Sequence, residues 1–446
     1  MRIVWMVLGS LCGLWLLGEI VVRIVCDLPV RTDFYGSIPR GGIAALQKRV
    51  GIRVNPGDTY IHLGWIADPK QDRYTVWRQG QDGRFRRLGR TRYGSFLVRN
   101  LLPDTTYTFR VSSVSGAVEE TLFARTLEAR SHESYRPVIE GGWHTLFHPR
   151  EHGDYLNDHA IYQSGDGRWH IVGITAFGSG DFSKERYFAH GVGDAFPFQN
   201  DRTMTELPPV ADQGRLAWAP CVVRANDQYY MWYSPHTAYC QTSPGGSTWQ
   251  ERPELAFRPA FAQFRDPMVL QVGQGQWLMY ATARHGLFSA VDIYQSFDAE
   301  RWQYIRSALR TGLGCERAAP QGSTESPFVF EYAGGYYLSV TYNNDSFFFD
   351  AMLLPLKVWR DKESYNDTLV FSSGNPYDFG TYRGRKRPSS LVVTLRAHAP
   401  EYIEHDGRWY LTSCGWPWVA SVTHGEAAWA ELRFERQERR KQRSEP

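Results

Sequence analysis

One pattern of apolar and polar positions occurs five times between residues 150 and 415. Each copy opens with a small or acidic residue, usually followed by Pro, and continues with an apolar run, a polar turn and an aromatic-rich run. The copies begin at Asp158, Ala219, Asp266, Ser326 and Ala399. In every copy an aromatic residue stands 11 positions later, namely Trp169, Tyr230, Trp277, Tyr337 and Tyr410. The pattern therefore indicates an internal repeat.

Each copy is typical of two short strands joined by a turn of Gly, Asp or Asn. A repeat of about 50 to 70 residues is characteristic of propeller blades. We therefore predict an all-β fold with a five-bladed β-propeller over residues 135–435. Because the first strand of each blade lies nearest the axis, the opening residues of the five copies should meet in one central pocket. Asp158, Asp266 and Glu325 would bring three carboxylates there.

A second all-β pattern occupies residues 45–128. It resembles a fibronectin type III domain: Trp65 corresponds to the core Trp of the family, and the run from Leu102 and Pro103 to Tyr107 resembles its tyrosine corner. The resemblance implies a β-sandwich in which the Tyr107 hydroxyl bonds to nearby backbone. We expect a spacer or a binding module, since no catalytic cluster falls there.

The two ends of the chain differ from the body. Ile3 to Gly18 is an uncharged apolar run after Arg2, which predicts a transmembrane signal-anchor over residues 1–28. An uncleaved anchor and a removed signal peptide are both open, and either places the remainder outside the cytoplasm, in the periplasm or at the cell surface. Residues 436–446 are highly charged and predict a disordered tail.

Composition narrows the function classes. The net charge is +3, which is too small to indicate nucleic acid or another polyanion as partner. Aromatic residues make up 15% of the chain and serve both for packing and as flat faces for sugar rings. Cys221 and Cys240 should lie on the first and third strands of one blade, about 10 Å apart, which is too far for a disulfide. No Cys and His set has the spacing of a zinc site.

Three carboxylates in a wet, aromatic-lined pocket fit the chemistry of glycosidic bond cleavage, which needs one acid and a second group acting as base or nucleophile. Residues 140–435 resemble the five-bladed propeller glycosidases, a group that includes glycoside hydrolase families 43, 32, 62 and 68. Four motifs carry the resemblance: Phe264 to Pro267 (FRDP), Glu325 to Pro327 (ESP), Leu156 to Asp158 (LND) and Trp218 to Pro220 (WAP).

The resemblance implies a role for each acid. Glu325 corresponds to the general acid, Asp266 to the residue that positions the acid and stabilises the transition state, and Asp158 to the general base of family 43. We therefore expect an inverting glycosidase. Two alternatives stay open: a retaining, fructosidase-like enzyme with Asp158 as nucleophile, and a glycan-binding surface protein without catalysis, because His159 stands where the families usually have Pro.

Further residues are candidates for contacts with a carbohydrate substrate. They are Asn157, His159, Trp218, Arg265 and His398. In family 43 a His near the axis can help hold a central calcium ion, so His398 is also the candidate for a structural calcium site, although no cofactor is expected to be required. Glu401, two residues after Ala399, points either into the pocket or toward an outer strand.

Overall fold

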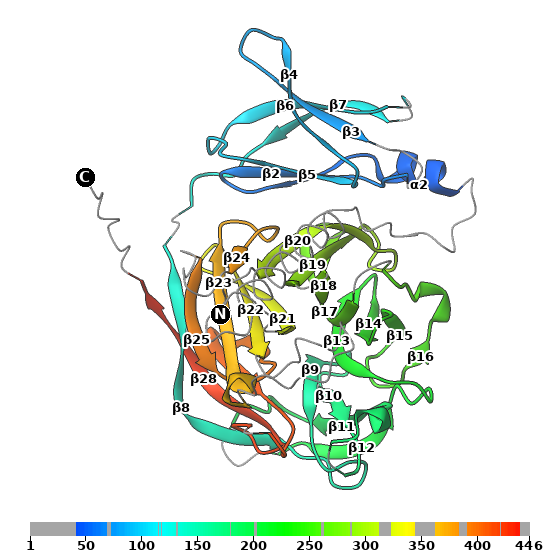
Figure 1. Cartoon of the computed structure of the whole chain (residues 1–446), viewed down its shortest axis with the longest axis vertical. Coiled ribbons are helices and arrows are strands. Elements are labelled where there is room, and N and C mark those ends of the chain that lie inside the picture. The colour runs from blue at the N-terminus through cyan, green and yellow to red at the C-terminus, as the bar shows by residue number, and fades with distance from the viewer. Residues whose placement is uncertain are drawn as a thin grey trace, which may run out of the picture.

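The computed structural model describes residues 42–68, 73–114, 116, 118–130, 133–178, 180–199, 203–259, 263–285, 288–311, 323–343, 362–382, 390–419 and 421–437. This part of the chain is nearly all β, as predicted, and forms two units (Figure 1). A small sandwich lies against the side of a larger ring of sheets.

The sandwich consists of a three-stranded sheet, β1-β2-β5, and a four-stranded sheet, β4-β3-β6-β7. Trp65, directly after β2, packs edge-on against Tyr74 in its core, with 5.3 Å between the ring centroids. The Tyr107 hydroxyl accepts a hydrogen bond from the Leu102 N–H at 2.8 Å, which is the corner contact predicted from the sequence. The strands are β1 (Arg53–Pro56), β2 (Tyr60–Gly64), β3 (Tyr74–Gln79), β4 (Phe85–Thr91), β5 (Ser95–Arg99), β6 (Thr106–Ser113) and β7 (Glu119–Arg125).

A helix precedes the sandwich. The sequence pattern predicts β structure from residue 45, whereas α2 (Gly42–Val50) is helical and the first strand begins at Arg53. Leu46 and Val50 lie one helical turn apart and pack with Ile66, which gives the segment a buried face. Gly51 ends the helix with a φ of 61° while its N–H bonds to the Gln47 carbonyl, as in a left-handed helix cap.

The ring is made of five blades, each with four main strands. Blade 1 has β9 (Asn157–Gln163), β10 (Trp169–Thr175), β11 (Tyr187–Gly193) and β12 (Thr205–Val210). Blade 2 has β13 (Trp218–Ala225), β14 (Gln228–Ser234), β15 (Tyr239–Ser243) and β16 (Gln250–Glu251). Blade 3 has β17 (Gln263–Gly273), β18 (Gln276–His285), β19 (Phe288–Ser296) and β20 (Gln303–Thr311), extended in parallel by β24 (Gly380–Tyr382). Blade 4 has β21 (Ser323–Tyr332), β22 (Gly335–Asn343), β23 (Asp367–Ser373) and β25 (Leu391–Arg396).

Blade 5 closes the ring by combining both ends of the propeller. Its first three strands are β26 (Tyr402–His405), β27 (Arg408–Ser413) and β28 (Ala427–Arg436), and its outer strand is β8 (Tyr135–Phe147). The strand β8, which precedes blade 1 in the chain, pairs with β28 of blade 5. This pairing closes the ring. The first strands β9, β13, β17 and β21 contact one another in sequence and therefore surround the axis (Figure 1).

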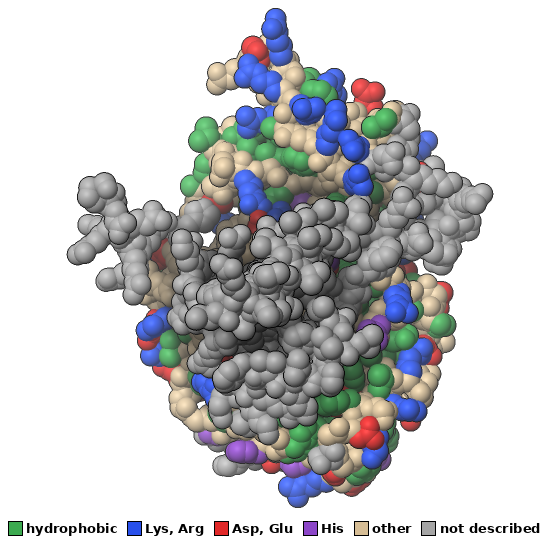
Figure 2. Space-filling view, in the orientation of Figure 1, with side chains coloured by type: hydrophobic (Ala, Val, Ile, Leu, Met, Phe, Trp, Pro, Cys, Tyr) green, Lys and Arg blue, Asp and Glu red, His purple; other side chains and the backbone are tan. Residues whose placement is uncertain are grey.

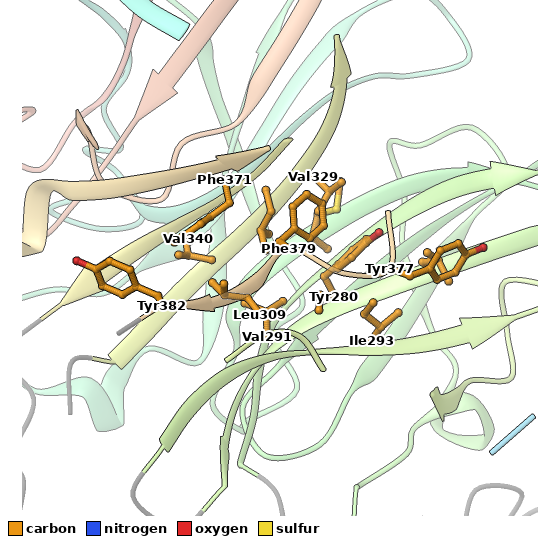
Figure 3. Packing of buried hydrophobic residues seen from close by; sticks show 14 of the residues in the cluster. Tyr280, Val291, Ile293, Leu309, Val329, Val340, Phe371, Tyr377, Phe379 and Tyr382 are labelled. Carbon is orange, nitrogen blue, oxygen red and sulfur yellow. The ribbon is translucent and has the colours of Figure 1, made fainter. Parts of the chain in front are cut away.

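Blade-to-blade packing explains most of the aromatic content. Between blades 3 and 4, residues of all strands from β17 to β24, together with Tyr60 of β2, form one buried cluster, in which Tyr280 and Phe371 are fully buried (Figure 3). The aromatic residue 11 positions after each opening residue lies on the second strand of its blade, as the repeat predicts. Four of these five side chains are buried, so their role is mainly packing.

The sandwich is fixed to blade 3 by polar contacts with backbone. The Gln295 amide donates to the carbonyls of Trp65 and Gly94, at 3.1 and 2.6 Å. In addition, His62 of the sandwich stacks on Tyr377 with ring centroids 3.9 Å apart. These buried contacts show that the sandwich has a defined position on the propeller.

Several predictions concern the ends of the chain and the thiols. The anchor over residues 1–28 and most of the tail over residues 436–446 lie outside the described residues, although β28 extends to Arg436. Within the described ranges, no helix is long and apolar enough to cross a membrane. Cys221 and Cys240 lie on β13 and β15 and are free, as expected.

Candidate active site

The opening residues of the five copies meet at the propeller axis, which confirms the geometric prediction from the repeat. They line one cavity of about 40 Å³, together with the residues that follow each of them. In four copies the opening residue has a positive φ between 44° and 55° and precedes Pro. The strand register shifts at this position in blades 2, 3 and 4, and opposite Asp158 in blade 1. Such bulges redirect side chains and are frequent beside active sites.

Ser326 connects two of the three predicted acids. Its hydroxyl donates to an oxygen of Asp158 at 2.7 Å, and its backbone N–H donates to an oxygen of Asp266 at 3.1 Å. Asp158, Asp266 and Ser326 come from blades 1, 3 and 4, so three separate repeats supply this contact. The sequence pattern identifies Ser326 as an opening residue but does not predict that it bridges the two carboxylates.

Arg265 connects the third acid. Its guanidinium lies 3.1 Å from an oxygen of Glu325 and 3.5 Å from an oxygen of Asp266. Asp158, Glu325 and Arg265 keep 14%, 15% and 23% of their side-chain surface exposed, whereas Asp266 keeps 4%. The first three therefore remain partly accessible to a ligand, and Asp266 is almost fully buried.

Burial and mutual repulsion change the acidity of the paired aspartates. Burial raises the pKa of Asp158 well above its usual range, and the charge of Asp266 raises it further. Burial also raises the pKa of Asp266, although the Arg265 guanidinium opposes this effect. The pair formed by Asp158 and Asp266 therefore binds a proton more readily than two ordinary aspartates do. Raised pKa values of this kind are common among catalytic acids and bases.

His398 and Asn157 are buried near Asp158. The Nε2 atom of His398 lies 3.7 Å from an oxygen of Asp158, and its Nδ1 atom hydrogen bonds to the Tyr365 carbonyl at 2.8 Å. Burial lowers the pKa of His398 to about 4, so the ring is neutral near pH 7. The Asn157 side chain accepts a hydrogen bond from the Tyr365 hydroxyl at 3.0 Å. Tyr365 thus bonds to both predicted residues; His398 approaches Asp158, whereas the side chain of Asn157 is buried.

His159 and Trp218 are placed differently. His159 lines the axial cavity and bonds through Nε2 to the Thr412 hydroxyl at 2.7 Å, and burial lowers its pKa to about 3. Trp218 begins β13 and packs at the edge of a hydrophobic cluster of blades 1 and 2. Neither contacts one of the three acids through a hydrogen bond found among the described residues.

A row of aromatic rings leads away from Asp158 and was not predicted from the sequence. Tyr365 stacks on His398 at 3.7 Å, Trp416 stacks on Tyr365 at 5.4 Å, and Trp418 stacks on Trp416 at 6.0 Å between ring centroids. Trp416 also donates to Glu185 through its indole N–H at 3.0 Å. The run GWPW at residues 415–418 is the sequence signal that points to this row.

Glu401 points toward the axis. It lines the cavity and accepts a hydrogen bond from the Ile161 N–H at 2.8 Å. Burial raises the pKa of Glu401 to about 8, so the Glu401 carboxyl is mostly protonated at pH 7. Of the two orientations that the sequence left open for Glu401, the structure shows the inward one.

The sequence suggests a structural calcium ion at His398. Among the described residues, no group of three or more His, Cys, Asp or Glu side chains is arranged to hold a metal ion. The Nδ1 atom of His398 is already bonded to a carbonyl. A structural calcium ion at His398 stays a prediction, and the mechanism below assigns its steps to protein groups.

Comparison with known proteins agrees with this geometry. Residues 199–345, about a third of the chain, match the family model of the glycosyl hydrolases family 32 N-terminal domain. The matched segment contains Asp266 and Glu325 and ends before blade 5. No curated protein matches the sequence.

Three of the solved structures with a similar backbone are glycosidases. An exo-1,5-alpha-L-arabinanase from a bovine ruminal metagenomic library is 13% identical over 64% of this chain and 94% of its own, with a TM-score of 0.41. The family 32 beta-fructofuranosidase of Bombyx mori is 16% identical over 66% and 62%, with a TM-score of 0.45. A family 43 beta-xylosidase/alpha-arabinofuranosidase from a compost metagenome is 15% identical over 67% and 95%, with a TM-score of 0.41. Likenesses this low decide nothing by themselves.

The family-model match confirms the resemblance predicted from the FRDP and ESP motifs. The protein is a glycoside hydrolase with a five-bladed propeller, and its residues 199–345 are similar to the family 32 N-terminal domain. Its substrate class is therefore carbohydrate.

Proposed function

We propose that the axial site hydrolyses a glycosidic bond by direct attack of water at the anomeric carbon. Glu325 protonates the leaving oxygen, Asp158 accepts the proton of the attacking water, and Asp266 stabilises the positive charge that develops on the sugar ring. The observation that supports this assignment best is the linkage of the three carboxylates through Ser326 and Arg265.

Each contact has a role in this scheme. The hydroxyl of Ser326 fixes the orientation of Asp158, which must present one oxygen to water. Arg265 lies between Glu325 and Asp266 and limits the repulsion between them. The raised pKa of Asp158 suits a base, because proton transfer is most effective when the pKa lies near the working pH.

A second scheme, in which Asp158 attacks the sugar as a nucleophile, is favoured by the match to the family 32 model. The two schemes differ in the anomer that is released first. We expect the inverted anomer, and proton NMR recorded within the first minutes of hydrolysis distinguishes the products before mutarotation mixes them. Release of the retained anomer would replace the water-attack scheme by the nucleophilic one.

Trp416 and Trp418, the two partly exposed rings of this row, provide a surface against which sugar rings pack, whereas Tyr365 is buried and supports Trp416 by stacking. Replacing Trp416 with Ala should raise KM about tenfold for an oligosaccharide substrate, since one stacked ring is worth roughly 1.4 kcal/mol. Trp416→Phe is the matched control, because it retains the stacking face and loses only the N–H bond to Glu185. An unchanged KM in Trp416→Ala would remove the row from the substrate path.

The location outside the cytoplasm also stays a proposal. It rests on the apolar run Ile3–Gly18, which lies outside the described residues. Fractionation of cells that produce the full chain tests it: recovery with the membranes supports an anchor, and recovery in the cytosol contradicts it.

A further inference from the structure

A cleft between the sandwich and blade 3 lies apart from the axial acids. It has a volume of about 560 Å³, which is within the range of ligand-binding sites. One wall comes from β4 and β5 of the sandwich, and the other from β20 and the segment around β24. None of the three acids lines it, and nothing in the proposed mechanism uses it.

The cleft is basic. Arg90, Arg306 and Arg310 line it, and Asp378 is the acidic side chain found among its described lining residues. Asp378 forms ion pairs with both Arg99 and Arg306, the latter at 2.8 Å. Burial would raise the pKa of Asp378, but these two arginines lower it, so it stays ionised and is already neutralised. Arginines therefore outnumber acidic side chains among the described residues that line the cleft.

The net charge of the whole chain does not reveal the basic character of the sandwich segment. Residues 42–130 contain 15 Lys and Arg but only 8 Asp and Glu, whereas the complete sequence has a net charge of only +3. The surplus on the sandwich segment is larger than that of the chain, so the remainder is net acidic. Basic side chains are spread over the sandwich surface (Figure 2). The weak net charge therefore does not exclude an acidic partner for this unit.

The other lining groups suit a sugar chain. Thr91 and Thr381 supply hydroxyls, and the half-buried ring of Phe96 offers an apolar face, whereas the buried hydroxyls of Ser95 and Ser307 are bonded to His62 and Asp292. Hydroxyls bond to sugar hydroxyls, and aromatic faces pack against sugar rings. Guanidinium groups bind carboxylate, sulfate or phosphate groups through paired hydrogen bonds.

We propose that this cleft is an accessory binding site for an acidic polysaccharide, that is, a glycan chain with anionic groups along its length. The arginines bind the anionic groups, while the hydroxyls and Phe96 contact the sugar rings. The site holds the enzyme on an acidic glycan independently of cleavage at the axis. The proposal goes beyond the proposed hydrolysis and concerns binding alone.

Affinity electrophoresis of the full chain through gels that contain a soluble polysaccharide tests the proposal. We expect retardation by polygalacturonate and by dextran sulfate, and none by uncharged dextran, which has the same backbone as the sulfated polymer. The double variant Arg90→Gln/Arg310→Gln should bind at least tenfold more weakly. A stronger effect on one acidic polymer identifies whether carboxylate or sulfate is preferred.

The matched control is Arg84→Gln/Arg87→Gln, which removes the same charge from exposed positions of the sandwich outside the cleft. It should bind within about twofold of wild type. Equal weakening in both double variants would mean diffuse charge attraction and overturn the proposal, as would equal retardation by uncharged dextran. Unfolding midpoints confirm that the variants fold. Glu325→Gln should still be retarded, which separates failure of this site from failure of the hydrolase proposal.

Discussion

Replacing Glu325 with Gln should reduce cleavage of natural glycosides by about 10²- to 10⁴-fold, while aryl glycosides with good leaving groups retain most of their rate. A natural leaving alcohol must be protonated as the bond breaks, and Gln has no proton to give. A nitrophenolate departs without one. The comparison of kcat for an oligosaccharide and for a dinitrophenyl glycoside of the same sugar measures the difference.

Glu331→Gln is the control for this substitution, since Glu331 lies on the same strand β21 and is exposed on the surface, 3.4 Å from Arg130. It should leave both rates unchanged. An equal loss on both substrates in Glu325→Gln would show that Glu325 does not serve as the acid and contributes to another step.

Replacing Asp158 with Asn should lower the rate on both substrate types alike, by about 10²- to 10⁴-fold. Attack of water requires the base whatever the leaving group is, so activated substrates gain nothing. Asp194→Asn, an exposed aspartate after β11 of the same blade, is the control and should be fully active.

The assignment of Asp158 as general base also predicts how activity falls at low pH. Asp158 must be ionised to act as base, and burial together with Asp266 raises its pKa in the folded protein. Activity should therefore rise with pH through a midpoint above that of an ordinary aspartate. A kcat/KM profile that stays flat below pH 5 would contradict the assignment of Asp158.

The repeat made much of the fold predictable. A fixed spacing between the opening residue and an aromatic is a property of the sequence, and it placed the first two strands of each of the five blades. Because every opening residue takes the same place in its blade, Asp158, Asp266 and Ser326 could be brought together without knowing any distance. The tyrosine corner at Tyr107 was predictable for a similar reason, since it depends on a local motif.

Other features depend on contacts that no local pattern encodes. Tyr365 reaches the site from the segment between β22 and β23, and Trp416 follows β27, so their stacking is decided by tertiary structure alone. The helix α2 was missed because it is only 9 residues long and directly precedes a strand-rich segment. The basic cleft was missed because charge was assessed for the whole chain and not for the sandwich segment.

The most direct test is incubation of the full chain, and of its Asp158→Asn variant, with a panel of nitrophenyl furanosides and pyranosides. We predict that the wild-type protein releases nitrophenol from at least one glycoside and that the variant loses this activity. Equal release by both proteins would show that the acids at the axis do not catalyse the reaction, and no release from any glycoside would contradict hydrolysis at this site.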